Sequence, residues 1–263
     1  MKKSIIVVVL SLTLLASPVL AKPADSVKSF KLPDNAVEIA PNVFSLGTTY
    51  DKQSHSMVEG YAFIHKKNDA KQNAIKGPKA PSCYGFLANG AKWKSIEPWI
   101  VNTSNGDGLS ELFVFDTISS DIGKWESAAS ADILGDGTKT NSVLVADEVT
   151  TDGKNEIYFG DLGTDGTIGV TIVWGIFSGP TFNRKLVEWD QIYNTYYNWS
   201  ASGEADKMDF DNIATHELGH SVGMNDIYNS SCSAVTMYGY ANYGETNKTT
   251  LEPADIKGIS TLY

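Results

Sequence analysis

Residues 216–226, which read HELGHSVGMND, constrain the fold and chemistry of this chain more than any other segment. On a helix, His216 and His220 lie one turn apart on the same face, so their imidazoles can hold one metal ion. Glu217 lies next to this face, where it can act as a general base on a water at the metal. The spacing therefore predicts a zinc site on a helix. The alternative is a surface helix that carries two solvated histidines.

The residues around this pair predict how the site is completed. Asp209, Asp211 or Asn212 can cap the start of the helix. Gly223 permits the backbone to leave the helix in a left-handed conformation. Asp226, three residues later, can then return to the metal as a third ligand and leave a fourth position open for water, as hydrolysis requires.

The pattern HExxHxxGxxD resembles the extended zinc motif of the metzincin proteases, and its aspartate makes it most similar to snapalysin-like enzymes. The rest of residues 85–263 is more similar to the matrixins: residues 234–239 resemble the Met-turn and residues 251–263 resemble the last matrixin helix. Matrixins carry histidine where this chain has Asp226. Their histidine-rich zinc loop has no counterpart, because no histidine lies between His65 and His216.

The resemblance implies an α+β fold: a twisted, mostly parallel sheet with an antiparallel edge strand, an active-site helix, a Met-turn and a C-terminal helix, preceded by a small β-rich N-terminal segment. It implies that Met237 lies beneath the metal without binding it. Residues 170–174 resemble the edge strand along which metzincins bind an extended substrate.

The resemblance also implies one catalytic zinc ion bound by His216, His220 and Asp226, with Glu217 as the general base toward the zinc-activated water. The expected function is that of an exported zinc-dependent endopeptidase. The alternative is a non-catalytic envelope or adhesion protein that retains the zinc-protease fold, and the presence of Glu217 argues against it.

The N-terminus and the charge indicate an exported protein. Lys2 and Lys3 precede an apolar run, and residues 19–21 suit a cleavage site, so residues 1–21 are expected to be a signal peptide, with an uncleaved anchor as the alternative. The formal net charge of −10 argues against nucleic acid and offers no basic patch for anionic lipid. We expect a secreted or cell-surface monomer that binds a protein or peptide substrate and has no membrane contact beyond the signal peptide.

Residues 22–82 are interpreted either as a removable pro-segment or as a small β module with a linker. Residues 43–47 and 57–64 alternate enough to predict two strands of a hairpin, and residues 66–82 read as a connector. His55 and His65 are expected to be solvated or strand-face residues rather than metal ligands.

The catalytic domain is expected over residues 83–263. Helical spacing predicts a helix within residues 108–131. Apolar and β-branched runs predict strands at residues 98–102, 143–145, 156–159, 168–176 and 182–189.

Cys83 and Cys232 leave three interpretations open. A disulfide would tie the start of the catalytic domain to the loop after Asp226. A thiolate switch, as in matrixin pro-segments, would place Cys83 on the zinc. Both could instead be free thiols, although export and the even count favour the disulfide.

The Gly- and Asp-rich stretches at residues 132–137 and 161–166 offer carboxylate and carbonyl oxygens, which calcium prefers. Plain hairpin turns are the alternative. Because metzincins often bind calcium near the edge strand, Asp161 and Asp165 are the candidate calcium ligands.

Overall fold

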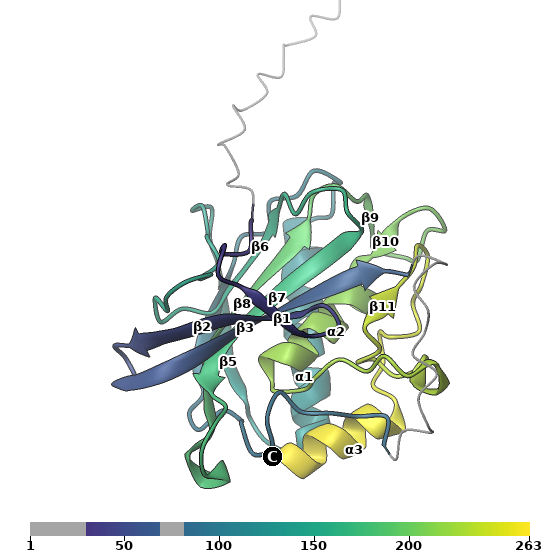
Figure 1. The fold of residues 1–263 in the computed structure, drawn as a ribbon. Helices are drawn as coiled ribbons and strands as arrows, with labels where there is room; N and C mark the ends of the chain where they lie inside the picture. Colours follow the sequence, from purple (N-terminus) through teal and green to yellow (C-terminus); the bar gives the residue numbers. More distant parts are fainter. Residues whose placement is uncertain (1–29, 69–81) are drawn as a thin grey trace, which may run out of the picture.

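The computed structural model describes residues 30–68 and 82–263 (Figure 1). The predicted signal peptide and most of the predicted connector lie outside the described residues. The elements in chain order are β1 (Val37–Ala40), β2 (Val43–Asp51), β3 (Ser56–Lys67), β4 (Glu97–Val101), α1 (Glu111–Ala129), β5 (Leu134–Lys139), β6 (Glu156–Gly160), β7 (Thr167–Ile176), the 3-10 turn η1 (Thr181–Asn183), β8 (Lys185–Asn194), β9 (Trp199–Ser200), β10 (Met208–Asp209), α2 (Phe210–Ser221), the 3-10 turn η2 (Ser230–Cys232), β11 (Tyr240–Ala241) and α3 (Pro253–Leu262).

One mixed sheet organises the described part of the chain. Its strand order is β1-β2-β3-β7-β8-β6-β4-β5, and β11 pairs with β3 beside this path. Strands β5, β4, β6 and β8 are parallel to their neighbours in this series, whereas β8–β7, β7–β3, β3–β2 and β2–β1 are antiparallel pairs. The predicted α+β class is confirmed. However, the antiparallel strand β7 is not an edge strand, because β3 covers it.

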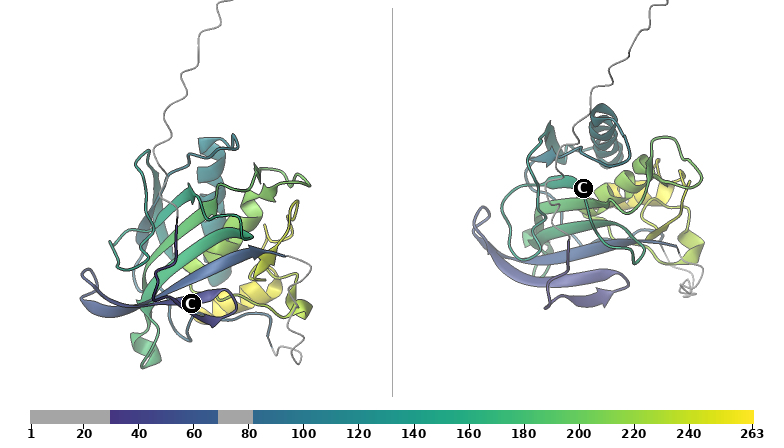
Figure 2. Two further views of the ribbon diagram at one scale, coloured as in Figure 1. Left: turned by 45° about the horizontal axis from the view of Figure 1, so that its top comes forward. Right: turned by 90° about the horizontal axis from the view of Figure 1, so that it is seen from above.

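The sheet separates two apolar cores because successive side chains of a strand point to opposite faces. Val173 of β7 belongs to the larger core, together with residues of α1, α2 and α3. Val170 and Ile172 belong to the smaller core on the other face. Figure 2 shows α1 near one end of the sheet and β1–β3 at the other. The uninterrupted burial of Thr167 through Gly175 follows from this coverage of both faces.

Helix α1 supports the helix that carries the zinc motif. Its start is capped by Ser110, whose hydroxyl accepts a hydrogen bond from the Phe113 amide (3.1 Å), and it ends at Ser130 in the left-handed region (φ 55°). Trp125 is fully buried, and its indole Nε1 donates to the carbonyl of Thr215 on α2 (2.9 Å). This bond fixes the distance between the two helices from inside the core.

Strand positions differ from the sequence prediction at residues 143–145, at β5 and at β8. Residues 143–145 form no strand, while β5 forms in residues that read as a Gly- and Asp-rich turn. Strand β8 extends to Asn194, five residues beyond its predicted end. Pairing with a neighbouring strand can outweigh local propensity. The glycines of β5 favour a turn, but its pairing with β4 makes it a strand.

No helix within residues 30–68 and 82–263 is long and apolar enough to cross a membrane.

A disulfide joins Cys83 to Cys232 across 149 residues, with the Cα atoms 5.5 Å apart. Of the three interpretations that the sequence left open, the structure has the first. The bond ties the segment before β4 to η2, a few residues after Asp226. A cross-link over so long a loop removes conformational freedom from the unfolded chain.

Replacing both cysteines, as Cys83→Ser with Cys232→Ser, is expected to lower the free energy of unfolding by about 2–5 kcal/mol, because the unfolded chain regains the entropy of an open loop. Guanidinium unfolding of the oxidised protein and of the double variant measures the difference. The wild-type chain under reductant is the control and is expected to match the variant. Equal midpoints for all three samples would contradict the prediction.

Candidate metal centre

Helix α2 presents the two histidines from a buried position. Asp209 caps the helix by accepting a hydrogen bond from the Asn212 amide (3.0 Å). His216 and His220 are one turn apart, with ring centroids 5.0 Å apart and an angle of 88° between the rings. Both side chains are almost fully removed from solvent. The sequence prediction of a helix that begins at the Asp209 region agrees with this placement.

Backbone carbonyls orient both imidazole rings. Nδ1 of His216 lies 2.7 Å from the carbonyl oxygen of Thr236, and Nδ1 of His220 lies 3.0 Å from that of Met224. A carbonyl can only accept, so each Nδ1 carries the proton and each Nε2 is left with a free lone pair. The two Nε2 atoms are thus the ones available to a metal.

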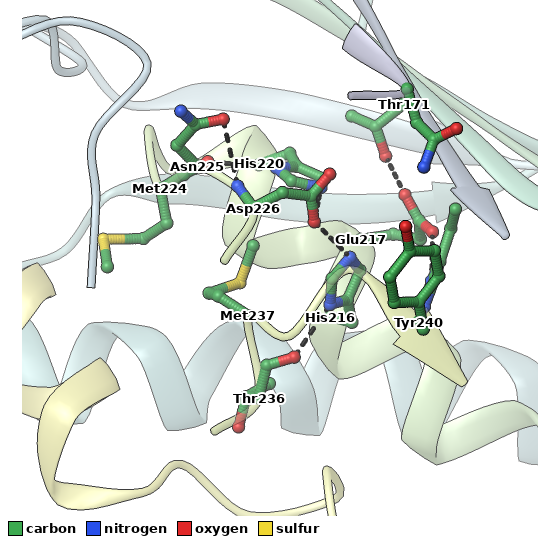
Figure 3. A network of polar contacts seen from close by, with 12 residues as sticks. Thr171, His216, Glu217, His220, Met224, Asn225, Asp226, Thr236, Met237 and Tyr240 are labelled. Carbon is green, nitrogen blue, oxygen red and sulfur yellow. Dashed lines mark hydrogen bonds and ion pairs between the residues drawn. The ribbon is translucent and has the colours of Figure 1, made fainter. Parts of the chain in front are cut away.

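Asp226 completes the cluster from the segment after α2 (Figure 3). Its Oδ1 lies 3.3 Å from Nε2 of His216 and 3.6 Å from Nε2 of His220. The backbone reaches this position because Gly223 adopts φ +104°, a conformation that side chains rarely permit. The structure therefore brings together the three ligands that the sequence predicts.

The unsatisfied atoms of the cluster fit a divalent metal ion. Nε2 of His216, Nε2 of His220 and Oδ1 of Asp226 are all buried and have no hydrogen-bond partner. Leaving three polar atoms unpaired in the interior is costly, and an ion between them would satisfy all three. Two imidazole nitrogens and one carboxylate oxygen form a donor set that zinc accepts.

The electrostatics of the cluster favour the protonation states that bind metal. Burial lowers the pKa of both His216 and His220, which keeps the imidazoles neutral. Burial by itself would raise the pKa of Asp226, but His220 and His216 outweigh it and hold that pKa well below its usual range. A neutral histidine pair beside an ionised carboxylate is the state in which all three can act as ligands.

The Met-turn is held by the C-terminal helix. Met237 is buried, and Figure 3 shows its side chain beside the cluster with no contact drawn to His216, His220 or Asp226. The carboxylate of Asp255 on α3 accepts hydrogen bonds from the amides of Thr236 (2.8 Å) and Met237 (3.3 Å). Since Thr236 also orients His216, helix α3 contributes to the ring orientation at the metal centre.

Tyr228 contacts the third ligand and was not foreseen from the sequence. Its hydroxyl donates to Oδ2 of Asp226 (2.9 Å), which leaves Oδ1 directed at the histidines. Burial raises the pKa of Tyr228, so the hydroxyl stays protonated and remains a donor. A partner of this kind orients a metal ligand and tunes its affinity.

Glu217 lies beside the cluster with both of its carboxylate oxygens in contact with other side chains. The hydroxyl of Thr171, on β7, donates to Oε2 (2.6 Å), and Nδ1 of His65, on β3, lies 3.0 Å from Oε1. Burial raises the pKa of Glu217. Neither Thr171 nor His65 was assigned to the site from the sequence.

His65 lies on a strand face beside the metal centre. Of its two expected positions, solvated or on a strand face, the structure has the second, on β3. Its side chain has no exposed surface, and its ring lies 3.9 Å, centroid to centroid, from that of His216. Alternation along β3 indicated only that residue 65 would face one side of a sheet. Which face meets the metal centre depends on the pairing of β3 with β7.

Among the residues that the structure describes, neither Asp161 nor Asp165 belongs to a cluster of three possible metal ligands. Asp165 forms an ion pair with Lys66 (2.8 Å), and Asp161 accepts a hydrogen bond from the Gly163 amide (2.9 Å), as in a turn. One further cluster among the described residues consists of carboxylates alone. Carboxylate oxygens of Asp147, Glu188 and Asp190 lie within 4.8 Å of one another.

Comparison with known protein families identifies the region that carries this centre. The family model described as Matrixin matches residues 115–263, which is more than half of the chain. The matched region runs from within α1 to the end of α3 and includes His216, His220 and Asp226, whereas β1–β3 lie outside it. No curated protein matches the chain.

Replacing Tyr228 by phenylalanine is expected to weaken zinc affinity by about 10–100-fold, because Asp226 loses the donor that orients it. Competition with a chelator of known affinity measures the change. Tyr263→Phe is the matched control, since it removes another largely buried hydroxyl, which donates to the carbonyl of Val222 (3.1 Å). An equal zinc affinity for wild type and Tyr228→Phe would contradict the assigned role.

Proposed function

Because the chain belongs to the matrixin family, whose members are zinc metallopeptidases, we propose that it is an exported zinc-dependent endopeptidase. The observation that carries the proposal is the position of Glu217. It lies on α2 directly after His216, beside the point where His216, His220 and Asp226 converge, where it would act on a water bound to the metal. A metal site with a purely structural role would not need this carboxylate, which argues against the non-catalytic envelope or adhesion protein.

The proposed reaction is the hydrolysis of a peptide bond. His216, His220 and Asp226 would hold the zinc ion, which when bound acidifies water and polarises the scissile carbonyl. Glu217 accepts the proton of the attacking water on a carboxylate oxygen and then delivers it to the nitrogen of the leaving amine. Its raised pKa suits this exchange, because it moves the carboxyl group toward the pH at which it must both accept and donate.

Two further groups support the proposed reaction. The hydroxyl of Thr171 holds Oε2 of Glu217 and so directs the carboxylate from the β7 side. An extended peptide would pair with the backbone of β7 along the edge that β3 covers in this structure, and such pairing requires no particular side chain. We propose residues 83–263 as the catalytic domain, acting as a monomer.

Export is supported by two features of the chain. Residues 1–21 have the composition of a signal peptide. The disulfide between Cys83 and Cys232 suits an oxidising compartment outside the cytoplasm. We therefore propose a secreted or cell-surface location.

The Glu217→Gln variant is expected to keep its zinc and to lose peptide hydrolysis by about 100-fold or more, because the amide cannot accept the proton of the water. Casein hydrolysis by zinc-loaded protein, assayed as the intact chain and after limited proteolysis, measures the loss. Metal content is determined on the same samples.

Glu204→Gln is the matched control, since Glu204 lies on the surface in an ion pair with Lys207 (2.8 Å) and is expected to leave hydrolysis unchanged. Removal of the metal by a chelator is expected to abolish activity, and added zinc to restore it. Hydrolysis that survives in Glu217→Gln would refute the assignment of the general base. Purified protein that binds no stoichiometric zinc would refute the metal centre.

A further inference from the structure

Strand β3 occupies the position where an extended peptide would bind. Within residues 30–68 and 82–263, β7 pairs with β8 and β3 alone, so without β3 one of its edges would be free. Residues Glu59 to Lys66 of β3 pair antiparallel with this edge. On the opposite side of β3, Lys66 and Lys67 pair with Tyr240 and Ala241 of β11. The C-terminal end of β3 therefore lies between β7 and β11, as Figure 1 shows.

The side chains of this strand reach the metal centre. Phe63 stacks on the ring of His220 with a centroid distance of 4.3 Å, and His65 lies over the ring of His216. These two positions are two residues apart and so lie on the same face of the strand. The strand thus covers both zinc-binding histidines.

Contact with Glu217 closes the remaining access. Nδ1 of His65 lies 3.0 Å from Oε1 of Glu217, the hydroxyl of Thr171 occupies Oε2, and the side chains of His65 and Glu217 have 0% exposed surface. A peptide carbonyl cannot approach a general base in this state. Nε2 of His65 is buried and has no hydrogen-bond partner, so the residue is not satisfied as an ordinary core histidine would be.

We propose that β3 is an intramolecular occupant of the peptide-binding groove, and that the intact chain is held closed by His65 seated on Glu217. The inference rests on the proposed function and adds its regulation. Strand β2 pairs with the outer edge of β3. Opening of the groove requires the pairing of β3 with β7 and with β11 to break. The family match begins after β3, so the occupant is a feature of this chain outside the matched region.

The first test compares the full-length, zinc-loaded wild type with His65→Ala. Two quantities are measured: hydrolysis of a fluorogenic peptide and equilibrium binding of a peptidyl hydroxamate, a metal-binding probe that needs access to the groove but no catalysis. Loss of a hydrogen bond to a charged group is expected to raise both by about tenfold or more. His55→Ala is the matched control, because His55 is exposed in the turn before β3 and its loss is expected to change neither.

A second variant opens the strand without touching the metal centre. A Cβ atom at Gly60 would lie 2.6 Å from the ring of Trp174, which is fully buried in β7, so Gly60→Val forces β3 away from β7. It is expected to raise hydrolysis and hydroxamate binding in the same direction as His65→Ala. Gly106→Val is the control, since nothing lies within 4 Å of a Cβ there.

The outcomes separate the closure from the catalytic proposal. Hydroxamate binding that rises in His65→Ala and Gly60→Val while hydrolysis stays absent would support the closure and refute the endopeptidase. Wild type that already binds the hydroxamate as tightly as both variants, with all proteins folded by circular dichroism, would overturn the closure. A rise in the His55→Ala or Gly106→Val controls of the same size would also overturn it, because the effect would then not come from β3.

Discussion

The metal centre depends on two hydrogen bonds from imidazole nitrogens to backbone carbonyls. Because Thr236 and Met224 accept from Nδ1 of His216 and His220, the opposite nitrogens converge on Asp226 and remain without partners. Because both rings are buried, an imidazole that turned away would leave its Nδ1 and the facing carbonyl without hydrogen-bond partners, so this ring orientation is strongly favoured. The ligand geometry is therefore a consequence of where two loops after α2 place their carbonyl groups.

The remainder of the fold holds those loops in place from three directions. Trp125 of α1 bonds the backbone of α2, and Asp255 of α3 bonds the Met-turn that contains Thr236. The disulfide from Cys83 fixes η2, which lies between Asp226 and the Met-turn. Each support joins segments far apart in the sequence. A rigid outer shell of this kind keeps metal ligands near their productive geometry.

Strand β3 gives the same sheet a second role. An exposed strand edge is a template for pairing with another chain, and a peptidase that binds extended peptides needs such an edge. Covering β7 with β3 satisfies that edge within the molecule and places His65 against Glu217. In the proposed scheme one strand protects the groove and keeps the general base from solvent.

Local spacing in the sequence was sufficient to predict the helix and to propose Asp209, Asp211 or Asn212 as its cap, of which the structure has Asp209. It also predicted which three side chains converge, because His216, His220 and Asp226 lie on one helix and the bend that follows it. The placement of Met237 and the α+β class followed from the resemblance over the C-terminal half. The roles of His65, Thr171 and Tyr228 could not be predicted, since each contact depends on strand register or on a loop path. For the same reason β5 formed where glycines indicated a turn. The sequence determined which side chains could share a metal ion, because their spacing is local. Only the tertiary structure, through the pairing of β3 with β7, decided that His65 lies against Glu217.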